Sequence, residues 1–313
     1  MTPPPPQQAL LGAASPLTAD VVAGPVRRAV VLARFDTAVY LAVGGHEEVL
    51  PVVTSDALML PTSVRLPVRS DALRWGIDPG DAVLVGGSSL RLGDHDVQVV
   101  RRWRPSQVTP VPGTVPAHRL ASLAEQLATA AAGAAGDPTE PADPAGPAAP
   151  AGPSLTVRSA AVLRAALSGS GDVVDARVRA LVGAGAGLTP SGDDALCAVL
   201  LVLRGVGADG AHTLVRAAVS AAAHRTTSLS ASLLHAAAGG YAVPAVADLV
   251  RAVLRDDPAA GGLALTAVLA IGHSSGRDLV AGIAGALHVL AAPPAPSVPP
   301  SVAVRQPVGR GNP

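Results

Sequence analysis

A glycine-rich segment that leads directly into an apolar run is the part of this sequence most suited to chemistry. It reads GAGAGLTPSGDD over residues 183–194 and continues without charge to Leu203. Glycine permits backbone conformations that other residues avoid, and free N–H groups at a helix start attract anions. We expect Ser191 to cap this helix and Asp194 to reach back to the cap. Asp193 and Asp194 are then candidates for a base, a metal ligand or an orienting group.

Two further segments have the same composition at a predicted helix start, HRTTSLSAS over residues 224–232 and GHSSGRD over residues 272–278. Ser, Thr and Asp are the usual capping residues, so capping is the simpler interpretation of any one segment. Three such segments in one domain, carrying Arg225, Arg277 and His273 between them, favour a shared anion pocket.

The three segments together resemble a known family. GxGLTPSGDD, Arg-Thr-Thr-x-x-Ser and Gly-His-Ser-Ser-Gly-x-Asp-Leu are similar to motifs of the family of the AllH subunit of oxamate carbamoyltransferase. The similarity extends over roughly residues 27–290, and in its N-terminal part it rests on residues 33–40 and the strand spacing. The chain departs from the pattern at Ala186 and Ala195, where we expect proline and phenylalanine, and at Tyr40, where asparagine is common.

This resemblance implies a subunit of a multi-chain enzyme that acts with other carbamoyltransferase subunits. Its reaction would convert oxalurate and phosphate to oxamate and carbamoyl phosphate in allantoin catabolism. Carboxylate, phosphate and carbamoyl groups call for arginine, hydroxyl and backbone N–H donors. We therefore assign catalytic roles to His273, Asp193 and Asp194. The substrate-binding set is Gly187, Thr189, Ser191, Gly192, Arg225, Thr226, Thr227, Ser228, Ser274, Ser275 and Arg277.

Two alternatives stay open on the sequence alone. No nucleophile can be identified, so the chain is either a transferase subunit or a non-catalytic module that binds a small anion or regulates a partner. Asp193, Asp194 and Asp278 are candidate Mg²⁺ ligands, or else they only interact with helix dipoles. No histidine has the spacing of a zinc site, and no other cofactor is expected.

Composition excludes several classes of protein. The formal net charge is zero, so a nucleic-acid partner is not expected. All 23 basic residues are arginine, which excludes a lysine Schiff base and a Walker-type phosphate lysine. The single cysteine, Cys197, cannot form an internal disulfide and fits a reducing cytoplasm, where we expect core packing to be its role.

No membrane association is expected either. The first residues, MTPPPPQQ, lack the charged and apolar regions of a signal peptide. The uncharged apolar stretches around residues 263–272 and 279–292 are shorter than the ~20 residues of a membrane span. We therefore expect a soluble cytoplasmic protein.

Changes in periodicity predict an α+β protein. Residues 25–105 show short period-two runs separated by Gly, Pro and Asp, as in a small β-barrel or sandwich. Residues 154–292 show the apolar period of packed helices. Residues 106–153 are expected to form a helix followed by a Pro/Ala-rich linker, and residues 1–24 and 293–313 to be disordered tails.

Overall fold

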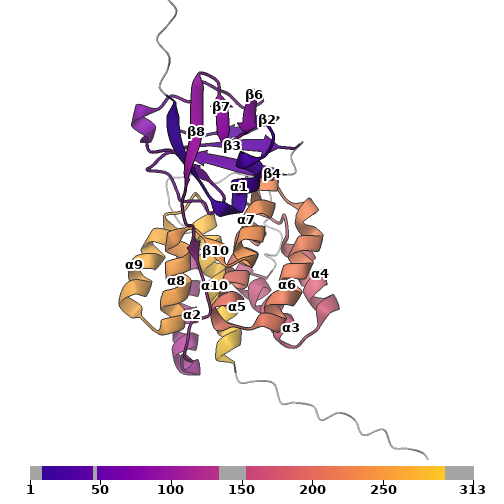
Figure 1. Ribbon diagram of the computed structural model, residues 1–313. Helices are drawn as coiled ribbons and strands as arrows, with labels where there is room; N and C mark the ends of the chain where they lie inside the picture. The colour runs from indigo at the N-terminus through magenta and orange to yellow at the C-terminus, as the bar shows by residue number, and fades with distance from the viewer. Residues whose placement is uncertain (1–8, 45–47, 134–152, 293–313) are drawn as a thin grey trace, which may run out of the picture.

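The computed structural model describes residues 9–44, 48–133 and 153–292. A β-barrel lies at one end of the molecule and a helical region at the other (Figure 1), which confirms the predicted α+β class. The predicted linker and C-terminal tail fall on 134–152 and 293–313, outside the described residues.

The barrel closes in the order β1-β5-β4-β3-β2-β6-β7-β8. Neighbouring strands are antiparallel except for two parallel pairs, β1 with β8 and β4 with β5. Its strands are β1 (Leu10–Ala14), β2 (Arg27–Arg34), β3 (Ala38–Val43), β4 (Glu48–Val53), β5 (Val64–Arg65), β6 (Ala82–Gly86), β7 (Ser89–Leu92) and β8 (His95–Arg102), joined in part by η1 (Pro16–Thr18), α1 (Ala19–Ala23) and η2 (Ser70–Ala72).

Valine and leucine side chains that alternate along these strands fill the barrel. Val39, Leu41 and Val43 of β3 point inward with Leu90 and Leu92 of β7, and all five are buried. β-Branched residues suit such a pleated, half-buried surface. The hairpin between β6 and β7 turns through residues 87–88, both with positive φ, which matches the twist of the two strands.

The predicted N-terminal tail is wrong for residues 10–23. These residues form β1, η1 and α1, and β1 closes the barrel by pairing with β8 and β5. The hydrogen bonds that hold β1 come from strands fifty or more residues away, and a local pattern of small residues does not reveal them. A barrel rather than a sandwich results because no strand edge of this sheet is left unpaired.

Nine helices, α2–α10, form the helical region within the part of the chain that the structure describes. They are α2 (Ala117–Gly133), α3 (Leu155–Leu167), α4 (Gly171–Leu181), α5 (Ser191–Val206), α6 (Asp209–Ala222), α7 (Ser228–Ala238), α8 (Pro244–Arg255), α9 (Pro258–Leu269) and α10 (Ser275–Ala291), with η3 (Ala223–Arg225) between α6 and α7.

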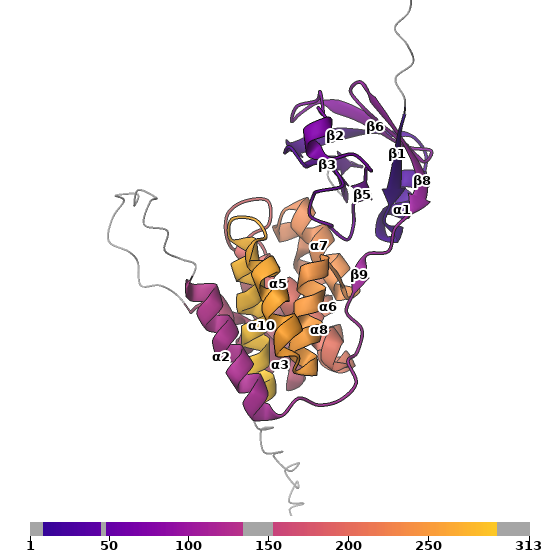
Figure 2. The ribbon, with the colours of Figure 1, turned by 90° about the vertical axis from the view of Figure 1, so that its left-hand side faces the viewer.

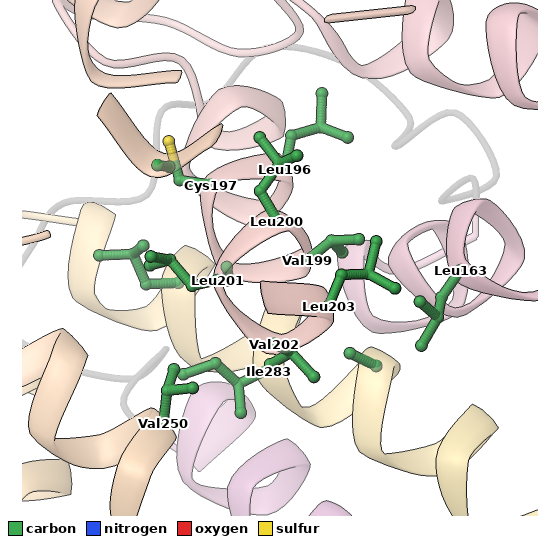
Figure 3. Close-up of a cluster of buried hydrophobic side chains, with 14 of the residues drawn as sticks. Leu163, Leu196, Cys197, Val199, Leu200, Leu201, Val202, Leu203, Val250 and Ile283 are labelled. Atoms are coloured by element: carbon green, nitrogen blue, oxygen red, sulfur yellow. The ribbon is translucent and has the colours of Figure 1, made fainter. Parts of the chain in front are cut away.

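Helix α5 is the centre of this region. Every residue from Gly192 to Leu203 is buried, and leucine and valine side chains project from it toward α3, α8 and α10 (Figure 3). Helix α10 approaches α5 closely at Gly282, where an added Cβ would lie 2.6 Å from the Ala195 carbonyl oxygen. Cys197 is 7% exposed in this core, and burial raises the pKa of its thiol.

A short two-stranded sheet joins the two ends of the molecule. β9 (Ser106–Gln107) leaves the barrel and pairs antiparallel with β10 (Tyr241–Ala242), which follows α7. The chain then runs along the helices to α2, which packs on α10 (Figure 2). Among the described residues, no helix has the length and hydropathy needed to cross a membrane.

Candidate active site

The start of α5 is built differently from the predicted cap. Pro190 occupies the N-cap position, Ser191 is the first helical residue, and no side chain caps the helix. The Gly192 N–H donates to the Ala184 carbonyl, and the N–H groups of Asp193 and Asp194 donate to Pro190. Because these donors are used inside the protein, the helix start itself does not offer them to an anion. The predicted role of Ser191 as the cap is therefore wrong, and the Gly192 N–H is already bonded within the protein.

Asp193 instead links the first predicted segment to the second. Its carboxylate is fully buried and accepts hydrogen bonds from the Gly183 N–H at 2.9 Å and from the Thr226 hydroxyl. Gly183 has φ +74°, and a Cβ there would lie 2.4 Å from the Arg225 carbonyl oxygen. Only glycine fits this close approach, so the glycine loop and the end of η3 are held together around one buried carboxylate.

Hydroxyl groups connect the same loop to α7 and α10. Thr227 is the N-cap of α7: it accepts from the Ser230 N–H and donates to the Leu188 carbonyl at 2.6 Å. Thr189 and Ser275 are 2.9 Å apart, oxygen to oxygen. The structure therefore brings all three helix-start segments together. Three unrelated helix caps would have no reason to meet in this way.

Asp194, the next residue of α5, has different surroundings from Asp193. It is 6% exposed, and its Oδ2 atom has no hydrogen-bond partner among the described residues. Burial raises the pKa of Asp194 to about 7; the nearby Asp278 and Asp193 carboxylates also raise it, whereas hydrogen bonds from Ser275 and Thr189 lower it. A carboxyl group with this pKa can hold or release a proton near neutral pH.

A cavity of about 650 Å³ opens beside Asp194, between the barrel and the helices. The first and third segments contribute Gly187, Thr189, Asp194, His273, Ser274 and Ser275 to its lining. Leucine, valine and alanine side chains of α5, α7 and α8 form much of the remaining wall. The N–H groups of Gly187 and Leu188 have no acceptor among the described residues, so this turn of the loop can donate to a ligand.

Several predicted site residues lie outside this lining. Arg225 is exposed and borders neither this cavity nor the second one described below, while Arg277 hydrogen-bonds the His273 carbonyl at 3.0 Å and is also absent from the lining. The glycine loop is instead fixed by hydrogen bonds that involve Asp193, Thr226 and Thr227. Ser228 faces the second cavity.

The predicted Mg²⁺ site is not assembled. Within the described ranges, no three His, Cys, Asp or Glu side chains are arranged to hold a metal ion, so Asp193, Asp194 and Asp278 do not form such a group. Asp193 instead accepts one hydrogen bond at each carboxylate oxygen, from the Gly183 N–H and from the Thr226 hydroxyl. Asp278 has a buried Oδ2 atom without a partner in the described chain and acts on Asp194 through its charge.

The barrel contributes residues that the sequence analysis did not assign to the site. Phe35 and Tyr40 line the cavity, with their rings edge to face at a centroid distance of 5.7 Å. Burial raises the pKa of Tyr40. Both residues fall in the segment 33–40 that carried the N-terminal part of the family resemblance, and this was the available signal. Leu58, Leu60 and Pro61 complete the barrel wall without any local signature.

Comparison with known proteins gives one match. Residues 181–287 match the family model described as oxamate carbamoyltransferase subunit AllH. The matched range contains all three helix-start segments and excludes the barrel, so the resemblance is confirmed for this part of the chain. No curated protein and no solved structure matches the chain.

Proposed function

We propose that the protein is a subunit of a carbamoyltransferase and that its substrate binds in the cavity beside Asp194. The family match over residues 181–287 is the observation that carries this proposal. The geometry supports it because the matched motifs surround a cavity that combines a carboxyl group of pKa about 7 with hydroxyl and backbone donors.

The finer reaction we propose is transfer of the carbamoyl group of oxalurate to phosphate. A phosphate oxygen forms a bond to the carbamoyl carbon, the C–N bond to the oxamate nitrogen breaks, and that nitrogen takes up a proton. Protonated Asp194 is suited to supply this proton, since its pKa is raised to about 7. His273, which is exposed at the cavity, is a second candidate for proton transfer.

Hydrogen-bond donors rather than arginine would hold the anionic groups here. No guanidinium belongs to the described lining of this cavity. Donors in the lining are the Gly187 and Leu188 N–H groups, which have no acceptor in the described part of the chain, and the Thr189, Ser274 and Ser275 hydroxyls. They suit a carboxylate or oxyanion charge that develops in the reaction. In the proposed enzyme the remaining cationic contacts come from other subunits.

The test is an assay of carbamoyl phosphate formation from oxalurate and phosphate, with the protein reconstituted with its partner subunits. We expect Asp194→Asn to lower kcat by about 10²–10⁴-fold, because the amide cannot transfer the proton. Asp172→Asn, which changes an exposed carboxylate at the start of α4, is the matched control and keeps the wild-type rate. Equal rates for wild type and Asp194→Asn would refute the role of Asp194.

Ligand binding separates the two functional classes. Binding of oxalurate or oxamate to the wild-type protein, with no turnover in any reconstituted mixture, would favour the alternative of a small-anion-binding regulatory module. Absence of both binding and turnover would reject the cavity as a site for these substrates. Isothermal titration calorimetry with each compound distinguishes these outcomes.

A further inference from the structure

A second cavity, of about 780 Å³, lies between the barrel and helices α6 and α7. It is separate from the Asp194 cavity, and only Tyr241 lines both. Its barrel side comes from η1, α1, β4 and the segment before β5, and its helical side from one face each of α6 and α7. Of the site residues predicted from the sequence, only Ser228 lines this space.

The helical wall of the second cavity is rich in donors. Arg216 and Ser220 stand four residues apart on α6, and Ser228, Ser232 and His235 follow one another at spacings of four and three on α7. Residues at these spacings share one helix face. Arg216 forms no ion pair with a carboxylate in the described part of the chain, so its guanidinium fork is available to a ligand.

The barrel wall adds one acid and one hydroxyl of interest. Glu48 lies at the cavity, but its carboxylate is already 3.6 Å from the Arg27 guanidinium, which offsets its charge. Thr62 is 5% exposed, and its buried hydroxyl has no hydrogen-bond partner among the residues described. A buried hydroxyl left unpaired costs free energy, which an acceptor in the cavity would recover.

We propose that this second cavity binds a small molecule through a compact oxyanion, a phosphate or a carboxylate, held by Arg216. Arginine binds both groups in two-pronged fashion, and the Ser232 hydroxyl of α7 supplies a further donor. The contrast with the Asp194 cavity, whose described lining has no guanidinium, makes this the more strongly anion-selective of the two spaces.

The second cavity also borders helix α7, whose N-cap residue positions the glycine loop that lines the first cavity. Helix α7 begins with Thr227, which holds the Leu188 carbonyl of the glycine loop, and the next residue, Ser228, faces the second cavity. A ligand that contacts Ser228 therefore acts one residue away from the hydrogen bond that positions the loop. Occupancy of the second cavity is expected to alter the affinity of the Asp194 cavity, and by linkage the reverse.

The test is calorimetric titration of the full chain, in buffer free of oxyanions, with inorganic phosphate and separately with malonate. The two arms show which oxyanion the cavity prefers. We expect Arg216→Ala to weaken binding about tenfold or more. The control is Arg255→Ala, which removes another exposed arginine at the end of α8, outside both cavities, and leaves binding unchanged. Arg216 lines the second cavity and not the Asp194 cavity, so a loss caused by Arg216→Ala reports on the second cavity.

A second variant distinguishes a loss of ligand binding from a loss of folding. Thr62→Val keeps the side-chain shape and removes an unpaired hydroxyl, so its melting temperature without ligand is expected to equal or exceed that of wild type. We expect its affinity for the oxyanion to fall as well. Failure of wild type to bind either anion, or equal losses in Arg216→Ala and Arg255→Ala, would overturn the proposal.

Discussion

The two sides of the α5 start differ in how fully their carboxylates are hydrogen-bonded. On the side that faces the glycine loop and η3, Asp193 accepts two hydrogen bonds and is fully buried. On the side that faces α10 and the cavity, Asp194 is almost as buried but keeps an oxygen without a partner in the described structure. Adjacent residues of the same type thus meet opposite surroundings because consecutive side chains on a helix point about 100° apart.

This difference indicates a division of roles. A satisfied buried carboxylate stabilises the fold that holds the loop, whereas an unsatisfied one costs stability and is kept where chemistry uses it. Sequence alone gives the two aspartates equal claims to catalysis. The hydrogen bonds separate them, and four experiments can break or sharpen the comparison.

The largest expected effect is on the pH dependence of stability. The folded-state pKa of Asp194 is raised from 3.8 to about 7, so between these values the unfolded chain is ionised while the folded chain keeps the proton. The contribution of Asp194 to the unfolding free energy therefore falls as pH rises, by up to about 4 kcal/mol from pH 4 to 7. Urea unfolding of wild type and Asp194→Asn at several pH values measures it as the difference between the two curves.

Other carboxylates titrate in the same range, so the difference between the curves, not the wild-type curve, is the relevant quantity. Asp194→Asn should gain stability relative to wild type as pH rises. Parallel curves for wild type and Asp194→Asn would mean that Asp194 is ionised in the folded protein at pH 5 and that its buried position does not retain the proton.

The next effect is on the satisfied side. Asp193→Ala leaves the Thr226 hydroxyl and the Gly183 N–H without their acceptor, and we expect a loss of about 3 kcal/mol in unfolding free energy at neutral pH. Asp193→Asn should lose less, because its amide oxygen still accepts one of these bonds. A loss of unfolding free energy well below about 1 kcal/mol in Asp193→Ala would show that Asp193 does not stabilise the fold in this way.

A smaller effect is expected at the link between the loop and α10. Thr189→Val removes the contact with Ser275, at a cost of about 1 kcal/mol in unfolding free energy. It also removes a hydrogen bond that lowers the pKa of Asp194, so that pKa should move further upward. Carboxyl NMR titration reports the shift, and Thr213→Val on the exposed face of α6 is the control. A downward shift would show that Thr189 does not donate to Asp194.

The smallest effect is expected for Arg225→Ala. The side chain is exposed and outside both cavities, so the unfolding free energy should change by less than about 0.5 kcal/mol. Binding of oxamate should also stay at the wild-type level. A clear loss of oxamate binding would restore the role that the sequence suggested for this arginine as an anion clamp.

The sequence predicts the elements of this fold well and their long-range partners poorly. Strands β2 to β8 fall within the predicted range 25–105, and helices α3 to α10 fall within the predicted range 154–292. Strand β1 was missed because its hydrogen bonds come from distant strands. For the candidate site, the motifs mark three segments that the structure brings together, but the direction of each polar group depends on tertiary contacts. The Asp193 bond to Thr226 and the exposure of Arg225 both depend on how η3 ends, which local propensity does not determine.

The β9–β10 pair has a consequence for how the site forms during folding. The Gln107 side chain donates to the Gly239 carbonyl across a sequence separation of 132 residues, and the same short sheet fastens the barrel exit to the end of α7. Closing so long a loop costs chain entropy that only later contacts repay, so such pairings are slow to form. The barrel and the helices are therefore expected to form their own cores first. The cavity between them, which Phe35 and Tyr40 line, is expected to form only when β9 pairs with β10.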